Sequence, residues 1–566
     1  MKKLVIYMKI FLLMIVIFLL VAILYIILKT LYSKNLEKNL KNKSWINSNV
    51  KLIKESSINK NIYVVEKNEN INIYNMLYQK VINEKITSLP EYNSDIDDLL
   101  MVYNPYGTNN NAVNIYFKTN DYYKLDYKIK VKGYSDFTKT PNNGKDSEYS
   151  KNHSYQLIGF VMGKKNLLTL TLTSKDGDKK EYNYTLDFSR YSIDTPNKLK
   201  VTSTKDDEVT DGLFAILGDS REDNDYIHLV DNDGIVRNEI PIIGYRGLRL
   251  LFNNNNMYFN ISEKILVSVN RLGQVINKYY LGKYKLHHDY AFDEKEENLL
   301  ILTSDTTKKS CEDSIIKLNL KTGKITDSFY LESVFKDVLE KAYYNEDEIP
   351  EQVESKGIDW MHINTINYLE NDTVIISSRE TSSIIKIKNI FTSPKIEYIL
   401  GDETIWKNFK EKKYLYQKKG DFTISGGQHT VTYTKTDDES VYYLTMFNNN
   451  LGTSLTMPQV DFKSIGLKYS SPTDKGVSYY YKYKVDEKNK TFELVDSFKV
   501  PWSAYMSSSQ EYKNNIIIDS ASKCIFTERD SNGDTIRKYK FKCESSIYIY
   551  RVFKYDFVNY YFKSNT

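Results

Sequence analysis

Six histidines occur in this sequence of 566 residues, and four of them stand in short, unusual contexts. Their motifs are Leu286-His-His-Asp, Asp359-Trp-Met-His-Ile-Asn and Ser425-Gly-Gly-Gln-His-Thr-Val. Arg379 lies between the last two motifs and follows an apolar run that is typical of a strand. We interpret the remaining histidines, His153 and His228, as structural, because each stands alone.

These residue types indicate a pocket for a tetrahedral oxyanion. Together, His288, His362, Arg379 and His429 would form a cationic cup. Arginine offers a planar fork of donors to the oxygens of such an anion. A neutral imidazole can attack sulfur or phosphorus, and a second imidazole can protonate a leaving phenolate. We therefore predict group transfer through a histidine.

Two other functions remain open at this point. His288, His362 and His429 could bind zinc or another divalent ion, which would make the protein a metal-dependent hydrolase or lyase. Arg379 counts against that alternative, because a cation beside a metal requires an anionic substrate. The second alternative is a non-catalytic propeller that serves as a binding module. No P-loop, zinc-protease or serine-hydrolase motif stands out in the sequence.

The elements that must position these residues are mostly short strands and turns. Beyond about residue 190, turns recur at Gly234, Gly273 and Gly323, and an apolar strand follows each of them. A four-stranded unit repeated every 40 to 60 residues or so is typical of propeller blades. We therefore predict that residues 190–566 form a six-bladed β-propeller. Its strands would converge on a central channel, where side chains distant in the sequence can meet.

The segments before the propeller predict two further elements. Residues 95–189 contain alternating strands with Asn, Gly and Asp turns, and we expect a small β-sandwich domain there. Residues 31–94 are rich in Lys and Asn and are expected to be a stalk or linker with some helix, near residues 71–86. The predicted fold class is therefore all-β, with a six-bladed β-propeller preceded by a small β-sandwich domain and an N-terminal transmembrane helix.

The N-terminal segment, residues 1–30, predicts a transmembrane signal anchor. Residues 10–28 form one apolar run of a length that spans a bilayer, and Lys2, Lys3 and Lys9 precede it. The catalytic part would then be exported, at the cell surface or in the periplasm. A cleaved export signal is the alternative, although no small-residue cleavage site follows Leu28.

Charge and cysteine content exclude some functions. The net charge is +5, from 78 basic and 73 acidic residues, so no nucleic-acid footprint is expected. The three cysteines lack C-x-x-C spacing, which argues against thiol metal sites. Cys524 and Cys543 flank a predicted turn and are expected to form either a disulfide or two buried thiols.

The ordered set of motifs resembles the active-site set of the bacterial aryl-sulfate sulfotransferases. The set consists of His-His-Asp at 287–289, Asp-Trp-x-His-Ile-Asn at 359–364, Ser-Ser-Arg at 377–379 and Gln-His-Thr-Val at 428–431. The segment Asn104-Pro-Tyr-Gly-Thr108 is similar to part of that family's N-terminal β-sandwich domain. The resemblance covers about residues 95–566 and preserves the order of the motifs.

The resemblance implies roles for these residues. His429 corresponds to the nucleophile that carries a transient sulfohistidine. Residues that hold the sulfuryl oxygens and assist proton transfer correspond to His288, His362 and Arg379; His288 is preferred over its neighbour because it directly precedes the aspartate. Supporting positions in substrate binding are Asn364, Thr430 and His287.

The resemblance also implies the reaction and its partners. The family transfers sulfuryl groups from a phenolic sulfate donor to a phenol acceptor by a ping-pong mechanism, with no nucleotide sulfate donor, cofactor or metal. Its members can form homodimers through the sandwich domain. Two departures stand out: residues 401–428 contain no cysteine, where well-known members carry a disulfide, and the predicted anchor is retained instead of cleaved.

Overall fold

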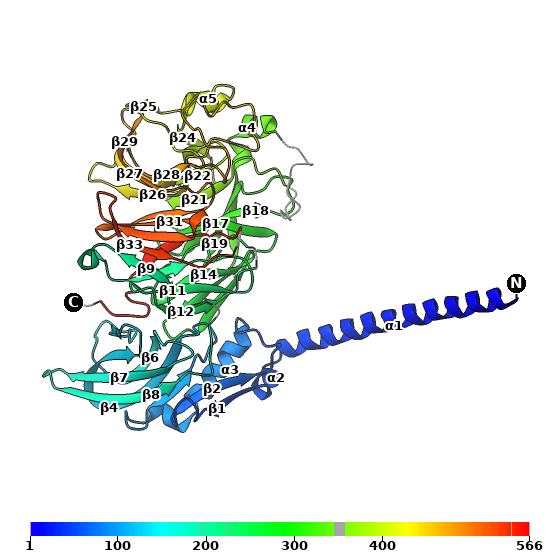
Figure 1. The fold of residues 1–566 in the computed structure, drawn as a ribbon, viewed down its shortest axis with the longest axis vertical. Helices are drawn as coiled ribbons and strands as arrows, with labels where there is room; N and C mark the ends of the chain where they lie inside the picture. The colour runs from blue at the N-terminus through cyan, green and yellow to red at the C-terminus, as the bar shows by residue number, and fades with distance from the viewer. Residues whose placement is uncertain (1, 194, 222, 344–356, 545, 565–566) are drawn as a thin grey trace.

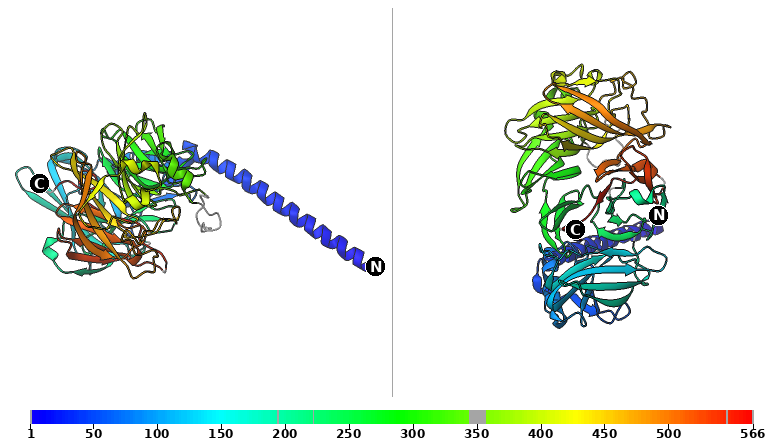
Figure 2. Two further views of the ribbon diagram at one scale, coloured as in Figure 1. Left: turned by 90° about the horizontal axis from the view of Figure 1, so that it is seen from above. Right: turned by 90° about the vertical axis from the view of Figure 1, so that its left-hand side faces the viewer.

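Two β-rich bodies follow a long N-terminal helix in the computed structural model (Figure 1). The structure describes residues 2–566 except 194, 222, 344–356, 545 and 565–566. Helix α1 (Lys2–Leu40) extends away from the two bodies, and Figure 2 shows the same arrangement from two further sides. Within the described residues, no helix has the length and apolar character needed to cross a membrane. The transmembrane anchor therefore stays a prediction.

The N-terminal body is built on one eight-stranded sheet whose strands run in the order β1-β2-β3-β4-β7-β8, with β5 and β6 also pairing with β4. Strand β4 belongs to both halves of this sheet, because residues 112–118 pair with β6 and residues 123–130 pair with β7. The strands are β1 (Val50–Lys54), β2 (Ile62–Lys67), β3 (Leu100–Tyr103), β4 (Ala112–Lys130), β5 (Phe137–Lys139), β6 (Ser150–Ile158), β7 (Lys165–Ser174) and β8 (Lys179–Asp187). The helical segments are α2 (Lys43–Ser48), α3 (Met76–Thr87) and η1 (Pro90–Asn93).

The expectation of a stalk over residues 31–94 is wrong for its larger part. Strands β1 and β2 extend the main sheet, and β2 pairs in parallel with β3. Helix α3 buries Tyr78, Val81 and Ile82 in a cluster with Leu100 and Val102. The polar composition concealed this packing, because the apolar residues are spaced at helical and strand periods between exposed Lys and Asn.

The second body is a propeller of six sheets within the described residues, which confirms that prediction. Four strands build each of the first four blades: β10 (Leu213–Ile216), β11 (Tyr226–Val230) and β12 (Val236–Pro241) with β34 (Val552–Tyr555); β13 (Leu251–Asn253), β14 (Asn256–Ser262), β15 (Ile265–Asn270) and β16 (Val275–Tyr280); β17 (Tyr284–Phe292), β18 (Asn298–Asp305), β19 (Ser314–Asn319) and β20 (Ile325–Tyr330); β21 (Ile363–Tyr368), β22 (Val374–Ser378), β23 (Ser383–Lys388) and β24 (Lys395–Leu400).

The last two blades each carry an extra strand. Their strands are β25 (Gln417–Lys419), β26 (His429–Lys435), β27 (Val441–Asn448), β28 (Val477–Asp486) and β29 (Thr491–Pro501), then β30 (Ser508–Tyr512), β31 (Asn515–Ser520), β32 (Ile525–Arg529) and β33 (Thr535–Lys540) with β9 (Lys200–Ser203). Short helical segments between strands are η2 (Asp206–Glu208), η3 (Leu331–Ser333), α4 (Lys336–Lys341), α5 (Glu403–Trp406), η5 (Lys410–Tyr414) and η6 (Ala521–Lys523).

Both ends of the propeller sequence close the ring. Strand β34, from the C-terminal end, pairs with β10 in the first blade, and β9, from the N-terminal end, pairs with β33 in the last blade. A disulfide joins Cys524 and Cys543 beside this seam, which decides between the two alternatives left open by the sequence. The inner strands β17, β21, β26 and β30 contact one another in succession around the axis.

Candidate active site

Three of the candidate residues lie on inner strands at the axis of the propeller: His288 within β17, His362 just before β21 and His429 at the start of β26. Each of these strands has a register shift nearby, between Leu286 and Tyr290, Ile363 and Thr365, and His429 and Thr432. Such bulges bend a strand and redirect its side chains. The backbone is left-handed at His288 (φ 52°), His362 (φ 47°) and Thr430 (φ 53°), which is costly for residues with a Cβ and common at functional sites.

The structure brings the four predicted catalytic residues together. The ring of His288 lies 4.8 Å from that of His362 and 6.4 Å from that of His429, measured between centroids. Arg379 follows β22 and places Nη1 3.4 Å from Nε2 of His362. All four side chains are largely buried. They converge although 141 residues separate the first and last of them in the sequence (429 minus 288).

The protonation state of His429 follows from its neighbours. Its Nδ1 lies 2.8 Å from Oδ1 of Asn449 and 3.0 Å from the carbonyl oxygen of Gly427, and both of these atoms are acceptors. The proton of the neutral ring must therefore be on Nδ1, which leaves a lone pair on Nε2. Burial is the main reason that the pKa of His429 falls to about 3, so the ring is neutral at ordinary pH.

His362 has the opposite protonation state. Its Nδ1 contacts Oδ2 of Asp359 and lies 2.8 Å from Oε2 of Glu312. Burial and Arg379 both act to lower the pKa of His362, but the two carboxylates outweigh them and raise it to about 9. His362 is therefore an imidazolium at neutral pH. Because Nδ1 is bound to the carboxylates, the Nε2 proton is the one available to a substrate.

His288 is a neutral ring that is held from both sides. Its Nε2 lies 3.2 Å from Oε2 of Glu312, and its Nδ1 lies 2.9 Å from the hydroxyl of Tyr550. Burial lowers the pKa of His288 well below its usual value, against the attraction of Glu312. Arg551 fixes the backbone at this point by donating to the carbonyl oxygens of His288 and Asn364 at 2.6 Å and 2.8 Å.

Arg379 is held by a carboxylate beside the pocket. Its Nε donates to Oε1 of Glu380 at 2.9 Å, and Nη2 contacts the same oxygen. Glu380 is itself fixed by Ser454, whose hydroxyl donates to Oε2 at 2.6 Å. Glu380 and Asp359 raise the pKa of Arg379 although burial opposes them, so its charge is permanent.

The three predicted supporting residues are placed differently from one another. Asn364 donates to the carbonyl oxygen of Gln428 at 2.8 Å and so braces the strand that carries His429. The hydroxyl of Thr430 accepts from the backbone N–H of Ser509 at 2.9 Å, which ties β26 to β30. Both contacts are with the protein backbone, so these residues position the site. His287 offers a ring nitrogen within 4.8 Å of ligand atoms of His288 and Glu312.

The two histidines interpreted as structural lie away from the axis. His153 is in β6 of the N-terminal domain, where it stacks on Phe117 and contacts the hydroxyls of Thr119 and Tyr155. His228 is in β11, beside Glu239 at 3.4 Å. Neither contacts the four candidate residues.

Sequence reasoning missed three residues of the site. Glu312 lies between His288 and His362, Asn449 orients His429, and Tyr550 contacts His288. Glu312 and Asn449 stand in polar stretches of a kind that is common in this chain, and Tyr550 is one of 49 tyrosines. No sequence signal pointed to them; in the structure Glu312 precedes β19, Asn449 follows β27 and Tyr550 precedes β34.

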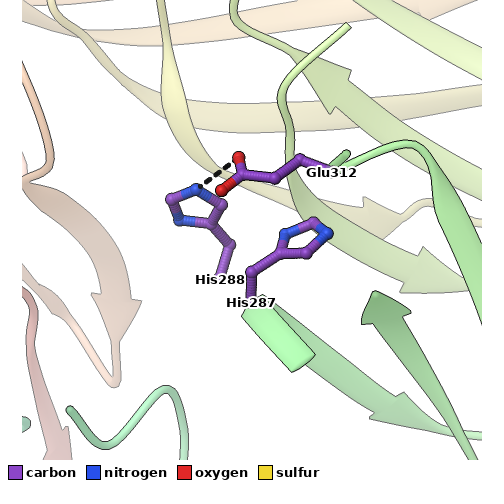
Figure 3. A group of neighbouring side chains, drawn as sticks. All are labelled: His287, His288 and Glu312. Carbon is purple, nitrogen blue, oxygen red and sulfur yellow. Dashed lines mark hydrogen bonds and ion pairs between the residues drawn. The ribbon is translucent and has the colours of Figure 1, made fainter. Parts of the chain in front are cut away.

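Two groups of side chains within the described residues have the composition of a metal site. One consists of His287, His288 and Glu312 (Figure 3), and the other of Glu312, Asp359 and His362. His429 belongs to neither group, so the metal set considered from sequence alone, in which it was a ligand, is not assembled in this form.

The fold and the site define a six-bladed propeller in which buried histidines, an arginine and the carboxylates that pair with them gather at the axis. Two family models match the chain: Arylsulfotransferase (ASST) over residues 198–552 and Arylsulfotransferase Ig-like domain over residues 100–189. The first match covers more than half of the chain. The chain therefore belongs to the arylsulfotransferase family, as its motifs predicted, and it is an aryl sulfotransferase.

Three solved structures show a distant resemblance to the chain. A protein of unknown function from Bacteroides caccae is 10% identical, covers 60% of this chain and 98% of its own, and gives a TM-score of 0.34. A functionally unknown protein from Desulfotomaculum acetoxidans is 8% identical, covers 61% of this chain and 99% of its own, and gives a TM-score of 0.35. Virginiamycin B lyase from Staphylococcus aureus is 11% identical, covers 62% of this chain and 90% of its own, and gives a TM-score of 0.31. No curated protein matches the chain. These likenesses support no conclusion about activity.

Proposed function

We propose that this aryl sulfotransferase works by a ping-pong mechanism in which His429 carries the sulfuryl group. The observation that supports this proposal best is the hydrogen bonding of His429. Two acceptors hold the proton on Nδ1, and within the described part of the chain Nε2 makes no hydrogen bond. A buried, neutral imidazole with a free lone pair is a competent nucleophile.

In the first half of the reaction, Nε2 of His429 attacks the sulfur of a phenolic sulfate ester. The N–S bond forms while the bond between sulfur and the aryl oxygen breaks, and the leaving phenolate takes the Nε2 proton of His362. The other proton of His429 stays on Nδ1, hydrogen-bonded to Oδ1 of Asn449. The sulfuryl group is then bound to His429 and the phenol departs.

The second half reverses these roles with a new phenol. The acceptor gives its hydroxyl proton to the now neutral His362, and its oxygen attacks the sulfur. The N–S bond breaks and its electron pair returns to Nε2 of His429. One aryl sulfate and one phenol are thus converted into the other aryl sulfate and phenol, with no net uptake of protons.

Arg379 and His362 are proposed to hold the sulfuryl oxygens, and His288, whose one N–H donates to Glu312 in this structure, would join them by turning to the substrate. Nη1 of Arg379 and Nε2 of the protonated His362 are both donors, yet they lie 3.4 Å apart. Two converging donors of this kind are satisfied by an anionic oxygen. Fixed charges in a buried pocket stabilise the charge that shifts in the transition state without reorganisation.

We further propose that the apolar segment 10–28 anchors the enzyme in a membrane and that the propeller faces the exported side. The length of this run and the lysines before it support the proposal. The small-molecule partners are then phenolic sulfates and phenols outside the cytoplasm. Cell fractionation should place the enzyme in the membrane fraction, and protease added to intact cells should digest the propeller. A propeller that stays in the soluble fraction, or that the protease does not reach, would contradict the proposal.

The decisive experiment for the mechanism is to trap the adduct. Incubation with an aryl sulfate and no acceptor should add one sulfuryl group that is labile in acid and maps to the peptide around His429. His429→Asn should keep the fold and lower transfer by at least about a thousandfold, because an amide cannot replace the nucleophile. His228→Asn, a buried histidine away from the axis, is the matched control. An adduct on another residue, or full activity in His429→Asn, would contradict the mechanism.

A further inference from the structure

His287 is a buried side chain to which the proposed mechanism gives no chemical step. It is 4% exposed, and neither Nδ1 nor Nε2 makes a hydrogen bond of ordinary geometry among the residues that the structure describes, although the backbone of Thr303 lies near enough to the ring to act on its pKa. A buried polar atom without a partner costs about 1–3 kcal/mol. Both nitrogens of this ring lack a well-formed hydrogen bond beside His288 and Glu312, which points to a ligand.

The neighbours of His287 show what that ligand is. Each of His287, His288 and Glu312 offers one ligand atom, and these atoms all lie within 4.8 Å of one another. Strand β17 supplies both histidines, whose rings lie 5.4 Å apart at 80° to each other. Glu312 reaches them from the turn before β19, and Figure 3 shows its carboxylate above the two rings.

This donor set has the chemistry of a transition-metal site. Two imidazole nitrogens and one carboxylate oxygen are ligands typical of zinc and its neighbours in the first transition row. Three protein ligands leave at least one coordination position open. Calcium and magnesium prefer sites made of oxygen atoms, so they suit this group less well.

We propose that His287, His288 and Glu312 bind a divalent transition-metal ion of the zinc class at the wall of the sulfuryl pocket. His288 and Glu312 would turn from each other to the ion, and a nitrogen of His287 would gain a bond to it. The second group, Glu312 with Asp359 and His362, is disfavoured. Nδ1 of His362 is already held by both carboxylates, and the charge of Arg379 lies 3.4 Å from its other nitrogen.

Metal binding has a consequence for catalysis, which rests on the proposed function. The ion occupies His288, a residue proposed to hold a sulfuryl oxygen, and it removes Glu312 from His362. The metal therefore competes with the aryl sulfate donor. Binding of the ion itself depends on none of these roles.

The site is tested by titrating the full chain, purified without a histidine tag, with Co²⁺ and with Zn²⁺. The wild type should bind one Co²⁺ per chain. The d–d absorption bands of the bound ion should have the intensity that is typical of four- or five-coordinate Co²⁺. His287→Ala and Glu312→Gln should each weaken binding by at least about tenfold. His228→Ala and Asp359→Asn are the controls and should bind like the wild type.

Several results would overturn the proposal. No stoichiometric binding by the wild type, or unchanged affinity in His287→Ala, would reject the site. Loss in Asp359→Asn with retention in His287→Ala would place the ion at the second group instead. Circular dichroism of each variant separates loss of the site from loss of the fold.

A kinetic arm tests the competition. Zn²⁺ should raise KM for the donor in the wild type. In His287→Ala, the KM with Zn²⁺ should differ much less from the KM of the same variant without metal. Bound metal with an unchanged KM would reject competition. Absence of transfer in the metal-free wild type would reject the proposed function while leaving the binding titration valid, so the two failures are distinguishable.

Discussion

At the scale of single residues, the state of His429 depends on how Asn449 is oriented. The amide nitrogen of Asn449 donates to the carbonyl oxygens of Ser503 and Met506, at 2.8 Å and 3.2 Å. Its oxygen must therefore face the imidazole, and only a ring protonated on Nδ1 can donate a hydrogen bond to that oxygen. Asn449 acts through His429 and is a positioning residue.

Replacing Asn449 should reduce the rate without greatly changing donor affinity. In Asn449→Ala, His429 can take either tautomer, and the nucleophilic nitrogen is protonated for part of the time. We expect kcat to fall by about a hundredfold, with KM for the donor changed less than threefold. Asn367→Ala is the matched control, because Asn367 braces the same strand through the carbonyl oxygen of Val431 without reaching His429. An equal loss in both variants would assign Asn449 a merely structural role.

The acidity of His362 predicts how activity depends on pH. Its pKa is raised to about 9, so the proton needed by the leaving phenolate is present below that pH and is lost as the pH rises through it. Single-turnover release of phenol should fall about tenfold per pH unit above 9. His429, with a pKa of about 3, should remain neutral and impose no acid limit near neutrality.

Removing one carboxylate should move the alkaline limit. Asp359→Asn deprives the His362 imidazolium of a neighbouring charge, so its pKa falls and the loss of activity begins at lower pH. Asp372→Asn is the control, since Asp372 pairs with Lys317 and lies outside the site. A profile in Asp359→Asn that overlays the wild type would show that another group supplies the proton.

At the scale of elements, the loop before β26 sets the position of His429. Gly426 donates to Oδ1 of Asn448 at 2.9 Å and accepts from the N–H of Leu451 at 3.1 Å. A Cβ at this position would lie 2.6 Å from the carbonyl oxygen of Leu451 and 2.7 Å from Cδ2 of Leu467. The loop therefore packs closely against the end of β27 and the residues that follow it, and only glycine leaves room for this contact.

The change Gly426→Ala should separate this loop from β27 and displace His429. We expect a loss of about 1–3 kcal/mol in the free energy of unfolding and a fall in kcat of about tenfold or more. In the control Gly177→Ala, the new Cβ meets nothing within 4 Å in the β7–β8 hairpin, so only backbone strain of about 1 kcal/mol is added. Denaturant unfolding and steady-state kinetics measure both. Unaltered kinetics in Gly426→Ala would show that the loop tolerates the shift.

The sequence predicted these elements where their local chemistry is distinctive. The turns at Gly234, Gly273 and Gly323 all join the two outer strands of a blade, and each glycine has a left-handed φ, between 68° and 86°, that favours glycine. Residues 50–67 were misjudged as stalk because β1 lies at the sheet edge and exposes three of its five residues. An edge strand of this kind has no continuous apolar pattern to find.

The site was predictable only to the extent that its residues were unusual. Histidine is rare in this chain, so motifs around His288, His362 and His429 could be recognised. Glu312 and Asn449 are of common residue types, and nothing local distinguishes them from their neighbours. They join the site through tertiary arrangement alone, because bulges and left-handed residues at the inner strands turn distant loops towards the axis.

At the scale of the whole molecule, the C-terminal end of the chain both closes the ring and connects the two bodies. Lys554 of β34 forms an ion pair with Glu528 of β32 at 2.7 Å, and both side chains are fully buried across the seam. Beyond β34, the chain returns to the N-terminal domain, where the N–H of Asn142 donates to the carbonyl oxygen of Tyr561 at 2.9 Å and Lys563 donates to Thr140 at 3.0 Å. The C-terminal segment thus fastens the two bodies together.

Truncation after Asp556 should therefore weaken the coupling between the bodies and leave the site intact. It removes four buried aromatic side chains, whose burial contributes about 1.5–3 kcal/mol each: Phe557, Tyr560, Tyr561 and Phe562. We expect calorimetry to resolve a separate transition of the N-terminal domain, at least about 5 °C below that of the propeller. The truncation removes the hydrogen bonds of this domain to Tyr561 and Lys563, whereas the blades keep their own sheets. Transfer at 25 °C should stay within about twofold, since the groups that meet at the axis lie before residue 552. Truncation after Ser564 is the control, and a calorimetric trace shared by both truncations would show that the segment carries no coupling.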